Sequence, residues 1–535
     1  MTAAHSLHSI VTSKSEIKDH NKHIVKPPVF TTKSIANYFL SRPTTLFPSR
    51  EELSQYEWSD VYNPFKSLRE VSLRQWNFFF IGFWAWTWDA LDYFTISLNV
   101  SNIAADLNVT VKDVSWGLTL VLMFRSVGAV LFGLVGDTKG RKWPYIINLL
   151  LLSVIQIGTG FITTYKEFLA VRSLFGIAMG GLYGICAAEA LSDAPRNARG
   201  IMSGIFQEGY AFGYLLAVVF QRAIVDTTGK WQNIMFFSAG VSVIFIVWRF
   251  FTPETDSFIK QQERISQEAE SDRKTKMKEL KSQARKAFKQ YWLISIYCVL
   301  MMAGFNFSSH GSQDLYPTML TKQFNFSADR STVANVCANL GALVGGIFFG
   351  HMSTFIGRRF GIICACVLTG VMIYPWGFKP NAGTVFVFQM GVQGAWGIAP
   401  IHLSELSPPQ FRTLVVGTSY QLGNLVSSAS STIEATIGER FPIAGAGKGV
   451  YNYGKTMAIF MAAVTLYLML IVFLGPENRG ADLGIERDDY YDEEGLDDLD
   501  DDLERKKTSD NDDYSLENTK ANAKHEEVVN VEQKV

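Results

Sequence analysis

Long runs of apolar residues follow one another along the chain and are separated by short polar connections. Each run is close to the ~20 residues that an α-helix needs to cross a lipid bilayer. The pattern predicts an all-α membrane protein with twelve transmembrane helices in two groups of six. The helices are expected at residues 76–100, 114–135, 143–163, 167–190, 200–223 and 232–252, and then at 292–317, 330–351, 359–379, 383–403, 413–436 and 452–475.

Polar segments divide the chain into five parts. These are an N-terminal arm, a first six-helix bundle, a basic loop, a second six-helix bundle and an acidic tail, at residues 1–75, 76–252, 253–291, 292–477 and 478–535. The arm and the tail hold too few apolar residues to bury a core, which predicts that they are mostly disordered. Lys506 and Lys507 in the tail are either sites for regulatory machinery or lysines without such a role.

The distribution of lysine and arginine predicts which side of the membrane each connection faces. Ten basic residues lie between Asp256 and Gln290, and positively charged connections favour the cytoplasmic side. Counted from this loop, the other even-numbered connections are also basic, with Lys139, Arg141, Lys142, Arg196, Arg199, Arg358, Arg359 and Arg412. Both termini are therefore expected in the cytoplasm, and the possible glycosylation sites at Asn108 and Asn325 fall on the outer face.

The two groups of six repeat the same landmarks in the same order. A glycine-rich basic connection follows the second predicted helix at residues 133–142 and the eighth at residues 345–359. The fourth and tenth helices both end in a glutamate followed by a proline and an arginine, as Glu189, Pro195 and Arg199 and as Glu405, Pro408 and Arg412. Two similar halves of this kind are typical of transporters that rock around a central site.

Composition narrows the class of protein further. With 48% hydrophobic residues, 19% charged residues and a net charge of -1, the chain has no basic excess that would indicate a nucleic-acid partner. Its five cysteines lie in apolar runs without the spacing of a zinc site, so no metal is expected. The sequence shows no phosphate-binding loop and no nucleophile triad. These observations argue against an enzyme and give no reason to expect a cofactor.

The densest polar cluster within an apolar run lies in the seventh predicted helix. At ~100° per residue, Asn306, Ser309, His310, Gln313 and Asp314 fall on one face. This face must point into the bundle, because lipid cannot satisfy its hydrogen bonds. His310 and Asp314 are one turn apart and can share a proton, which predicts a role in proton coupling. The alternative is that these side chains join helices through interhelical hydrogen bonds.

Arg125 lies near the middle of the second predicted helix, where a permanent charge is costly. A guanidinium binds a carboxylate through two parallel hydrogen bonds, which makes Arg125 a candidate anchor for an organic anion. The alternative is a permanent ion pair with a buried acid such as Asp89. Asp89 and Asp92 share a face of the first helix and are candidates either for proton coupling or for pairing with Arg125 or Arg172.

Two further groups complete the candidate residues. Polar side chains lie at similar depths in the fifth and eleventh helices, where they are candidates to contact a hydroxyl or keto oxygen of the substrate. They are Gln207 and Glu208 in the fifth helix and Gln421 and Asn424 in the eleventh. In the repeated connections, acid and base can form a charge latch that gates the cytoplasmic side, through Asp137, Arg141 and Arg358. His351 stands where the second copy would carry its acid, so the second latch is expected to be weaker.

Two motifs resemble those of known families. Gly133, Asp137, Gly140, Arg141 and Lys142 resemble the signature between helices 2 and 3 of the major facilitator superfamily. The polar face of the seventh helix resembles the corresponding motif of the fungal lactate/pyruvate-proton symporters, the Jen family of carboxylate permeases. The fixed positions of that motif are filled by Asn306, Ser309, His310, Ser312, Gln313, Asp314 and Thr318. The resemblance extends from about Asn63 through Pro476.

The resemblance implies uptake of lactate, pyruvate or acetate together with protons at the plasma membrane, by alternating access. It also adds Thr318 to the candidate substrate-binding residues. Dicarboxylates such as malate or succinate, or a sugar acid of the sialate type, are alternative substrates for the same fold. A sensor that binds a carboxylate without moving it is an alternative of another class.

Overall fold

The structure is a computed structural model that describes residues 28–483, except residues 29, 50–52, 55–56, 257, 260–272, 439, 444–450 and 482. In this part of the chain the regular structure is helical, apart from one isolated bridge between Pro442 and Tyr451. The predictions for residues before 28, for the tail beyond 483 and for Lys506 and Lys507 concern residues outside this part.

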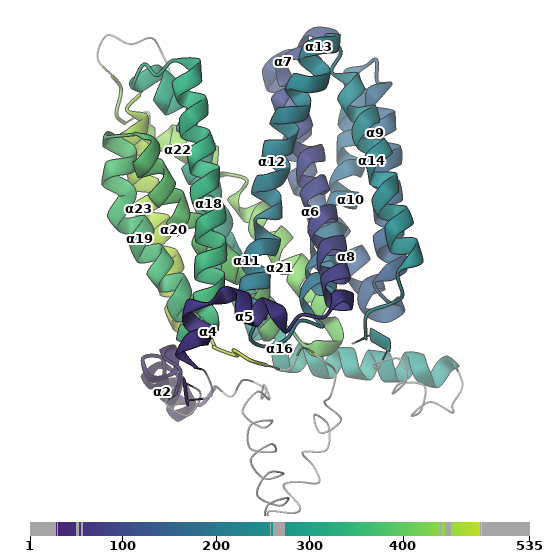
Figure 1. Cartoon of the computed structure of the whole chain (residues 1–535), viewed down its shortest axis with the longest axis vertical. Coiled ribbons are helices and arrows are strands. Elements are labelled where there is room, and N and C mark those ends of the chain that lie inside the picture. The colour runs from purple at the N-terminus through teal and green to yellow at the C-terminus, as the bar shows by residue number, and fades with distance from the viewer. Residues whose placement is uncertain are drawn as a thin grey trace, which may run out of the picture. The chain divides into compact units, whose positions relative to one another are not determined.

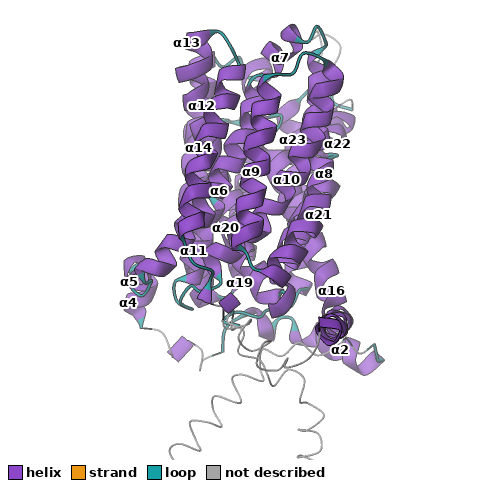
Figure 2. Cartoon of the chain, turned by 90° about the vertical axis from the view of Figure 1, so that its right-hand side faces the viewer, coloured by secondary structure: helices purple, strands orange, loops and turns teal. Residues whose placement is uncertain are grey.

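Twelve helical passages run up and down one bundle (Figure 2). The first six are α6 (Leu73–Leu98), α8 (Val111–Lys139), α9 (Lys142–Gly160), α10 (Tyr165–Leu191), the pair α11 (Arg199–Gln207) and α12 (Gly209–Phe220), and α14 (Gln232–Phe251). The second six are α16 (Arg273–Gln313), α18 (Ala328–Ile356), α19 (Arg358–Phe378), α20 (Ala382–Leu406), the pair α21 (Arg412–Ser427) and α22 (Ser430–Gly438), and α23 (Tyr453–Leu474). The predicted class of fold is confirmed.

Short elements lie at the ends of these passages. They are α7 (Val100–Asp106), η2 (Gln221–Val225), α13 (Asp226–Thr228), α17 (Tyr316–Thr318), η3 (Met319–Gln323) and η4 (Pro409–Phe411). We call the end of the bundle with the α8–α9 and α18–α19 connections the base, and the opposite end, with α7 and α13, the top (Figure 1).

Eight of the described helices are long and apolar enough to cross a membrane. The other four passages are α6, α20 and the two broken pairs. Tryptophan, glutamine and glycine lower the apolar character of α6 and α20, and each member of a broken pair is short. One break falls at Glu208, within the helix predicted at 200–223. The other follows Ser427, within the helix predicted at 413–436.

The seventh passage and the N-terminal arm also differ from the prediction. α16 begins at Arg273, so the second part of the loop predicted at 253–291 is helical, and Figure 1 shows it lying across the base. This stretch is rich in Lys, Glu, Ala and Gln, which are good helix formers that a search for apolar runs passes over. The arm predicted to be disordered contains α2 (Thr32–Ser41), η1 (Thr44–Leu46), α4 (Trp58–Tyr62) and α5 (Pro64–Arg69).

Contacts with the base explain why part of the arm is ordered. The Tyr38 hydroxyl donates to the Leu474 carbonyl at 2.8 Å, and Arg42 Nη1 donates to the Gly475 carbonyl at 2.7 Å. His351 Nε2 lies 3.1 Å from the carbonyl oxygen of Val61 in α4. These partners are far away in the sequence, so composition alone does not reveal them.

Glycine contacts repeat in the two halves. Gly140 and Gly357 occupy matching connections and adopt φ angles of 93° and 97°, a region that glycine enters without steric cost. α8 packs closely on α10 in the first half, and α18 packs closely on α20 in the second. At both contacts a glycine faces the backbone of its partner helix, as expected where helices associate within a bilayer.

We expect Gly180→Val to destabilise the bundle by about 1–3 kcal/mol or to prevent its assembly. A side chain on Gly180 of α10 would collide with the backbone of Arg125 in α8. The measurement is the fraction of detergent-purified protein that stays monodisperse after heating. Gly158→Val is the matched control, because a Cβ on Gly158 meets nothing within 4 Å. Equal thermal stability of the two variants would contradict this account of the α8–α10 contact.

Candidate functional site

A cavity of about 300 Å³ lies between the two halves. Figure 1 shows the halves meeting near the base, around α11 and α21, and standing apart toward the top. The polar and charged side chains that line the cavity come from α6, α8, the α11–α12 pair, α16, α17, α18, α20 and α21. They include Arg125, Gln207, Glu208, Asn306, Ser309, His310, Ser312, Gln313, Asp314, Asn335, Asn339, Gln389, Gln393 and Asn424.

Arg125 is buried, with 1% of its surface exposed, and still lines the cavity. Its Nε lies 3.1 Å from the sulfur of Met179, and its guanidinium carbon lies 5.1 Å from the centre of the Tyr93 ring. Thioether sulfur is only a weak acceptor. Among the described residues no acidic side chain forms an ion pair with Arg125. The site therefore presents a positive charge whose strong hydrogen-bonding capacity is unused.

The polar face of α16 reaches the same cavity. Asn306, Ser309, His310, Gln313 and Asp314 all line it, as the helical spacing predicts. His310 Nδ1 lies 3.2 Å from Asp314 Oδ2, and 26% and 35% of these two side chains are exposed. The pair is thus partly accessible to water.

Thr318 and Gln421 are placed differently from the other candidates. Thr318 lies beyond the end of α16, in α17, and is not among the residues that line the cavity. Gln421 is fully buried in α21, and neither of its side-chain polar atoms has a hydrogen-bond partner within the described chain. Its neighbours Tyr420 and Asn424 line the cavity instead. Gln207 lines the cavity and accepts a 3.4 Å hydrogen bond from the Tyr183 hydroxyl.

The two aspartates of α6 are enclosed within the first half. Asp92 accepts a hydrogen bond from the Ser238 hydroxyl of α14. Asp89 is buried, and neither of its carboxylate oxygens has a hydrogen-bond partner among the described residues. Neither aspartate lines the cavity or forms one of the ion pairs of the described structure. The pairing of Asp89 with Arg125, which was the alternative role for that arginine, is absent from this conformation of the described chain.

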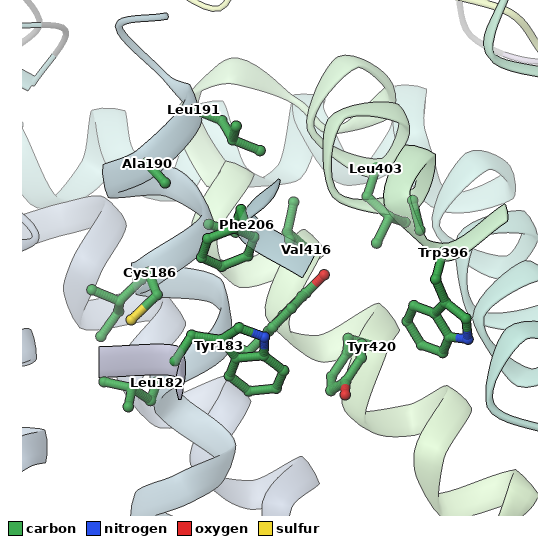
Figure 3. Packing of buried hydrophobic residues seen from close by; sticks show 14 of the residues in the cluster. Leu182, Tyr183, Cys186, Ala190, Leu191, Phe206, Trp396, Leu403, Val416 and Tyr420 are labelled. Atoms are coloured by element: carbon green, nitrogen blue, oxygen red, sulfur yellow. The ribbon is translucent and has the colours of Figure 1, made fainter. Parts of the chain in front are cut away.

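Sequence reasoning did not find the aromatic layer at the inner end of the cavity. The rings of Tyr183 in α10 and Tyr420 in α21 stack with centroids 4.1 Å apart, which joins the two halves. Trp396 of α20 lies 5.8 Å from Tyr420, and Phe206 of α11 lies 6.0 Å from Tyr183. Figure 3 shows these rings packed together. These rings come from four helices, two in each half, so the pattern within any one helix does not predict the layer.

Below the aromatic layer the halves are joined at the base. Asp137 at the end of α8 accepts hydrogen bonds from the backbone N–H groups of Thr413 and Leu414, at 3.0 and 2.8 Å. Thr413 and Leu414 belong to the first turn of α21, where exposed N–H groups favour a negative charge. Arg141 instead donates to the Ala188 carbonyl of its own half at 3.1 Å.

The second half has a different arrangement. Arg358 forms two hydrogen bonds of 3.0 Å each with the carboxylate of Glu405, and both side chains are buried. His351, which replaces the expected acid, contacts Val61 of α4 rather than the first half. The described residues include no group of three or more His, Cys, Asp or Glu side chains placed to hold a metal ion.

The chain beyond α23 also closes the base. Arg199 of the first half donates to the Ala481 carbonyl at 2.8 Å, and Arg412 of the second half donates to the Leu483 carbonyl at 2.7 Å. Ala481 and Leu483 are buried. The prediction of a solvated tail from residue 478 is therefore wrong for these first residues, because they are held between the two halves.

A twelve-helix bundle with two similar halves around a central cavity defines a transporter of the major facilitator fold. The solved structure of the proton:xylose symporter XylE resembles the chain with a TM-score of 0.62 at 15% identity, covering 77% of this chain and 98% of that one. The chain belongs to the sugar (and other) transporter family, whose family model matches residues 64–487. Its family is one of transporters, which confirms the prediction that the chain is not an enzyme.

Several proteins of known name resemble most of the chain. A carboxylic acid transporter protein homolog of Saccharomyces cerevisiae is 38% identical over 493 residues, which cover 88% of this chain and 79% of that protein. This relative confirms the resemblance to fungal carboxylate permeases. The cis,cis-muconate transport protein of Acinetobacter baylyi is 23% identical and covers 67% of this chain and 86% of its own length. The sialic acid transporter NanX of Escherichia coli is 24% identical, with coverages of 76% and 95%.

Proposed function

We propose that this protein imports short monocarboxylates such as lactate, pyruvate and acetate, together with protons, across the plasma membrane. The observation that carries the proposal is the buried guanidinium of Arg125, which lines the cavity without an acidic partner among the described residues. A substrate carboxylate would supply the charge and the two acceptor atoms that the guanidinium lacks. The names of the yeast and Acinetobacter relatives support an organic acid as the substrate class.

The charge of the lining favours monocarboxylates over dicarboxylates. Arg125 is the one Lys or Arg side chain in the described lining of the cavity, so it matches one carboxylate. A second substrate carboxylate would need a second positive group, since a buried unpaired charge is costly. Asn306, Ser309, Gln313 and Gln207 line the cavity and offer hydrogen bonds to a hydroxyl or keto oxygen.

Protons provide the driving force in this proposal. An anion moving inward against a negative-inside potential is opposed by about 2.3 kcal/mol per charge for each 100 mV. A proton that travels with the anion removes this cost. His310 and Asp314 are the proposed carriers, because they form a partly exposed pair in the cavity wall. Asp89 and Asp92 are less accessible, since both are enclosed in the first half.

The basic connections support a cytoplasmic position for the base and for both termini. The cavity of this conformation then opens toward the outside. We assign the gate at the base to Asp137, Arg141 and Arg358, which hold the ends of helices at or near the junction of the halves. Rocking of the two halves would open the base and release substrate and proton inside.

Uptake of labelled lactate tests the proposal, in cells that lack their own carboxylate permeases, at pH 5 and at pH 7.5. We expect saturable uptake that is faster at pH 5 and that raises the external pH, because each anion enters with a proton. Unlabelled pyruvate should compete and unlabelled succinate should not.

Other outcomes of this experiment assign other roles. Competition by succinate or malate would replace the monocarboxylate proposal with a dicarboxylate transporter. Binding of lactate without accumulation, by protein that reaches the cell surface, would indicate a sensor. Uptake that leaves the external pH unchanged would exclude proton coupling.

A further inference from the structure

Glu208 occupies an unusual place for an acidic residue. It forms the break between α11 and α12, and its side chain lines the central cavity although only 3% of the residue is exposed. Its Oε1 atom has no hydrogen-bond partner within the described chain, and Glu208 takes part in none of the ion pairs found there. A carboxylate held in this way would carry an uncompensated charge, which is far more costly than a neutral acid.

The carboxyl group of Glu208 rests on the second half of the protein. A Cβ on Gly346 of α18 would lie only 2.9 Å from Glu208 Cδ and 2.9 Å from its Cγ. Gly346 is also where α11 crosses α18, because a Cβ on Gly204 would lie 2.8 Å from the Gly346 carbonyl carbon. Glu208 therefore lines the cavity and also packs against α18 at the point where α11 crosses it and the two halves meet.

The titratable groups around Glu208 do not compensate its charge by direct contact. The same cavity is lined by Arg125 of α8 and by His310 and Asp314 of α16. The tyrosines of the lining are Tyr93 of α6, Tyr210 and Tyr214 of α12, Tyr316 of α17 and Tyr420 of α21. The polar lining residues from α18 and α20 are amides, which do not titrate. His310 and Asp314 interact with each other, which leaves Arg125 and Glu208 as the two ionisable side chains of opposite sign without an ion pair in this lining.

The charges of Arg125 and Glu208 together determine how well the cavity accepts an anion. With Glu208 ionised, its charge balances that of Arg125, and an incoming anion would leave the closed cavity with a net negative charge. With Glu208 neutral, the substrate carboxylate itself balances Arg125. Electrostatic interactions are strong in a cavity that excludes water, so an anion binds more favourably when Glu208 has taken up a proton.

We propose that Glu208 is a proton-carrying residue of this transporter. It takes up a proton from the cavity in the conformation described, and it releases that proton toward the base when α11 separates from α18. The role rests on the proposed proton-coupled uptake of carboxylates and extends it, because it places a coupling residue at the junction of the halves.

Purified full-length protein in lipid vesicles tests this role by separating exchange from accumulation. Glu208→Gln keeps the shape of the side chain and cannot release a proton. With an inside pH of 7.5 and an outside pH of 6.5, one proton per anion supports up to about tenfold accumulation of labelled lactate. We expect the wild type to approach this ratio and Glu208→Gln to stay near onefold. Exchange of labelled for unlabelled lactate, without a pH gradient, should remain within about threefold of wild type.

Two further variants make the result specific. Glu208→Asp retains a titratable group and should restore part of the accumulation. Glu434→Gln is the matched control, since Glu434 of α22 is also a buried acid without hydrogen-bond partners among the described residues but lies outside the cavity lining. It should accumulate lactate as the wild type does.

Each result decides between the two proposals. Undiminished accumulation by Glu208→Gln overturns the role of Glu208 and leaves the proposed function in place. Loss of both exchange and accumulation in folded Glu208→Gln protein also overturns it, because the residue would then be needed for structure or substrate binding. Accumulation by the wild type that does not respond to the pH gradient overturns proton coupling itself, and the role of Glu208 with it.

Discussion

Replacement of Arg125 by alanine is expected to lower the uptake of labelled lactate about 30-fold or more, because truncation of one partner in a buried charge pair typically costs 2–5 kcal/mol. The guanidinium is buried in the cavity wall, with Met179 and Tyr93 as its neighbours. Neither neighbour offers the two acceptor oxygens that a carboxylate provides. Arg125→Lys keeps the charge but loses the planar fork, so we expect an intermediate loss.

Uptake is measured together with the amount of protein at the cell surface, so that transport is separated from folding. Arg222→Ala is the control, since Arg222 lies on the exposed side of η2. The Arg222→Ala protein should transport lactate normally. The double variant Arg125→Ala, Asp89→Asn tests the alternative role of Arg125. Recovery of uptake in that variant would show that Arg125 serves to neutralise Asp89, and normal uptake by Arg125→Ala alone would exclude it as the anchor.

Replacement of Asp314 by asparagine is expected to lower uptake about 100-fold or more and to remove its acceleration at acid pH, as loss of a proton-transfer group typically costs 10²–10⁴-fold. Asp314 Oδ2 lies 3.2 Å from His310 Nδ1, and both side chains are partly exposed in the cavity wall. Asparagine preserves the shape and the hydrogen bond but removes the charge that stabilises a protonated histidine. The pair then has no carboxylate with which to share a proton.

The measurement compares uptake at pH 5 and pH 7.5 and records the external pH. Asp329→Asn is the control, because Asp329 lies exposed in the first turn of α18. The Asp329→Asn protein should show the uptake rate and pH dependence of the wild type. If Asp314→Asn keeps both the rate and the pH dependence of the wild type, the α16 pair does not couple protons. If the rate falls while the pH dependence remains, Asp314 contributes to substrate binding or packing and another acid carries the proton.

The sequence determined the class of fold because the bilayer imposes one rule on every spanning segment. Each segment must satisfy its own backbone hydrogen bonds and be apolar over about 20 residues. The sequence therefore shows a series of apolar runs of that length. The polar face of α16 was predictable for a related reason. Helical spacing alone places Asn306, His310 and Asp314 on one side, and lipid excludes that side from the surface. Gly140 and Gly357 likewise marked the tight connections of both halves.

Tertiary structure decided which of the polar residues share one cavity. Asp89 and Arg125 are both charged residues of apolar runs, yet Arg125 lines the cavity and Asp89 is enclosed within the first half. This difference depends on how each helix is rotated about its own axis and on which helices pack against it. Neither the rotation nor the packing partners follow from the spacing of residues within one helix. Thr318 was assigned through a motif, but the end of α16 at Gln313 places it in a separate short helix, α17.

The contacts between the halves depended on tertiary structure most of all. Asp137 was predictable as a gating residue from its motif, but its partners, two backbone N–H groups of α21, carry no side-chain signature. Glu208 stood beside Gln207 without distinction in the sequence. Only the crossing of α11 on α18 sets its carboxyl group against Gly346. Local patterns report on a residue's own helix, whereas the partner across an interface is fixed by how the two helices pack, and that depends on the whole chain.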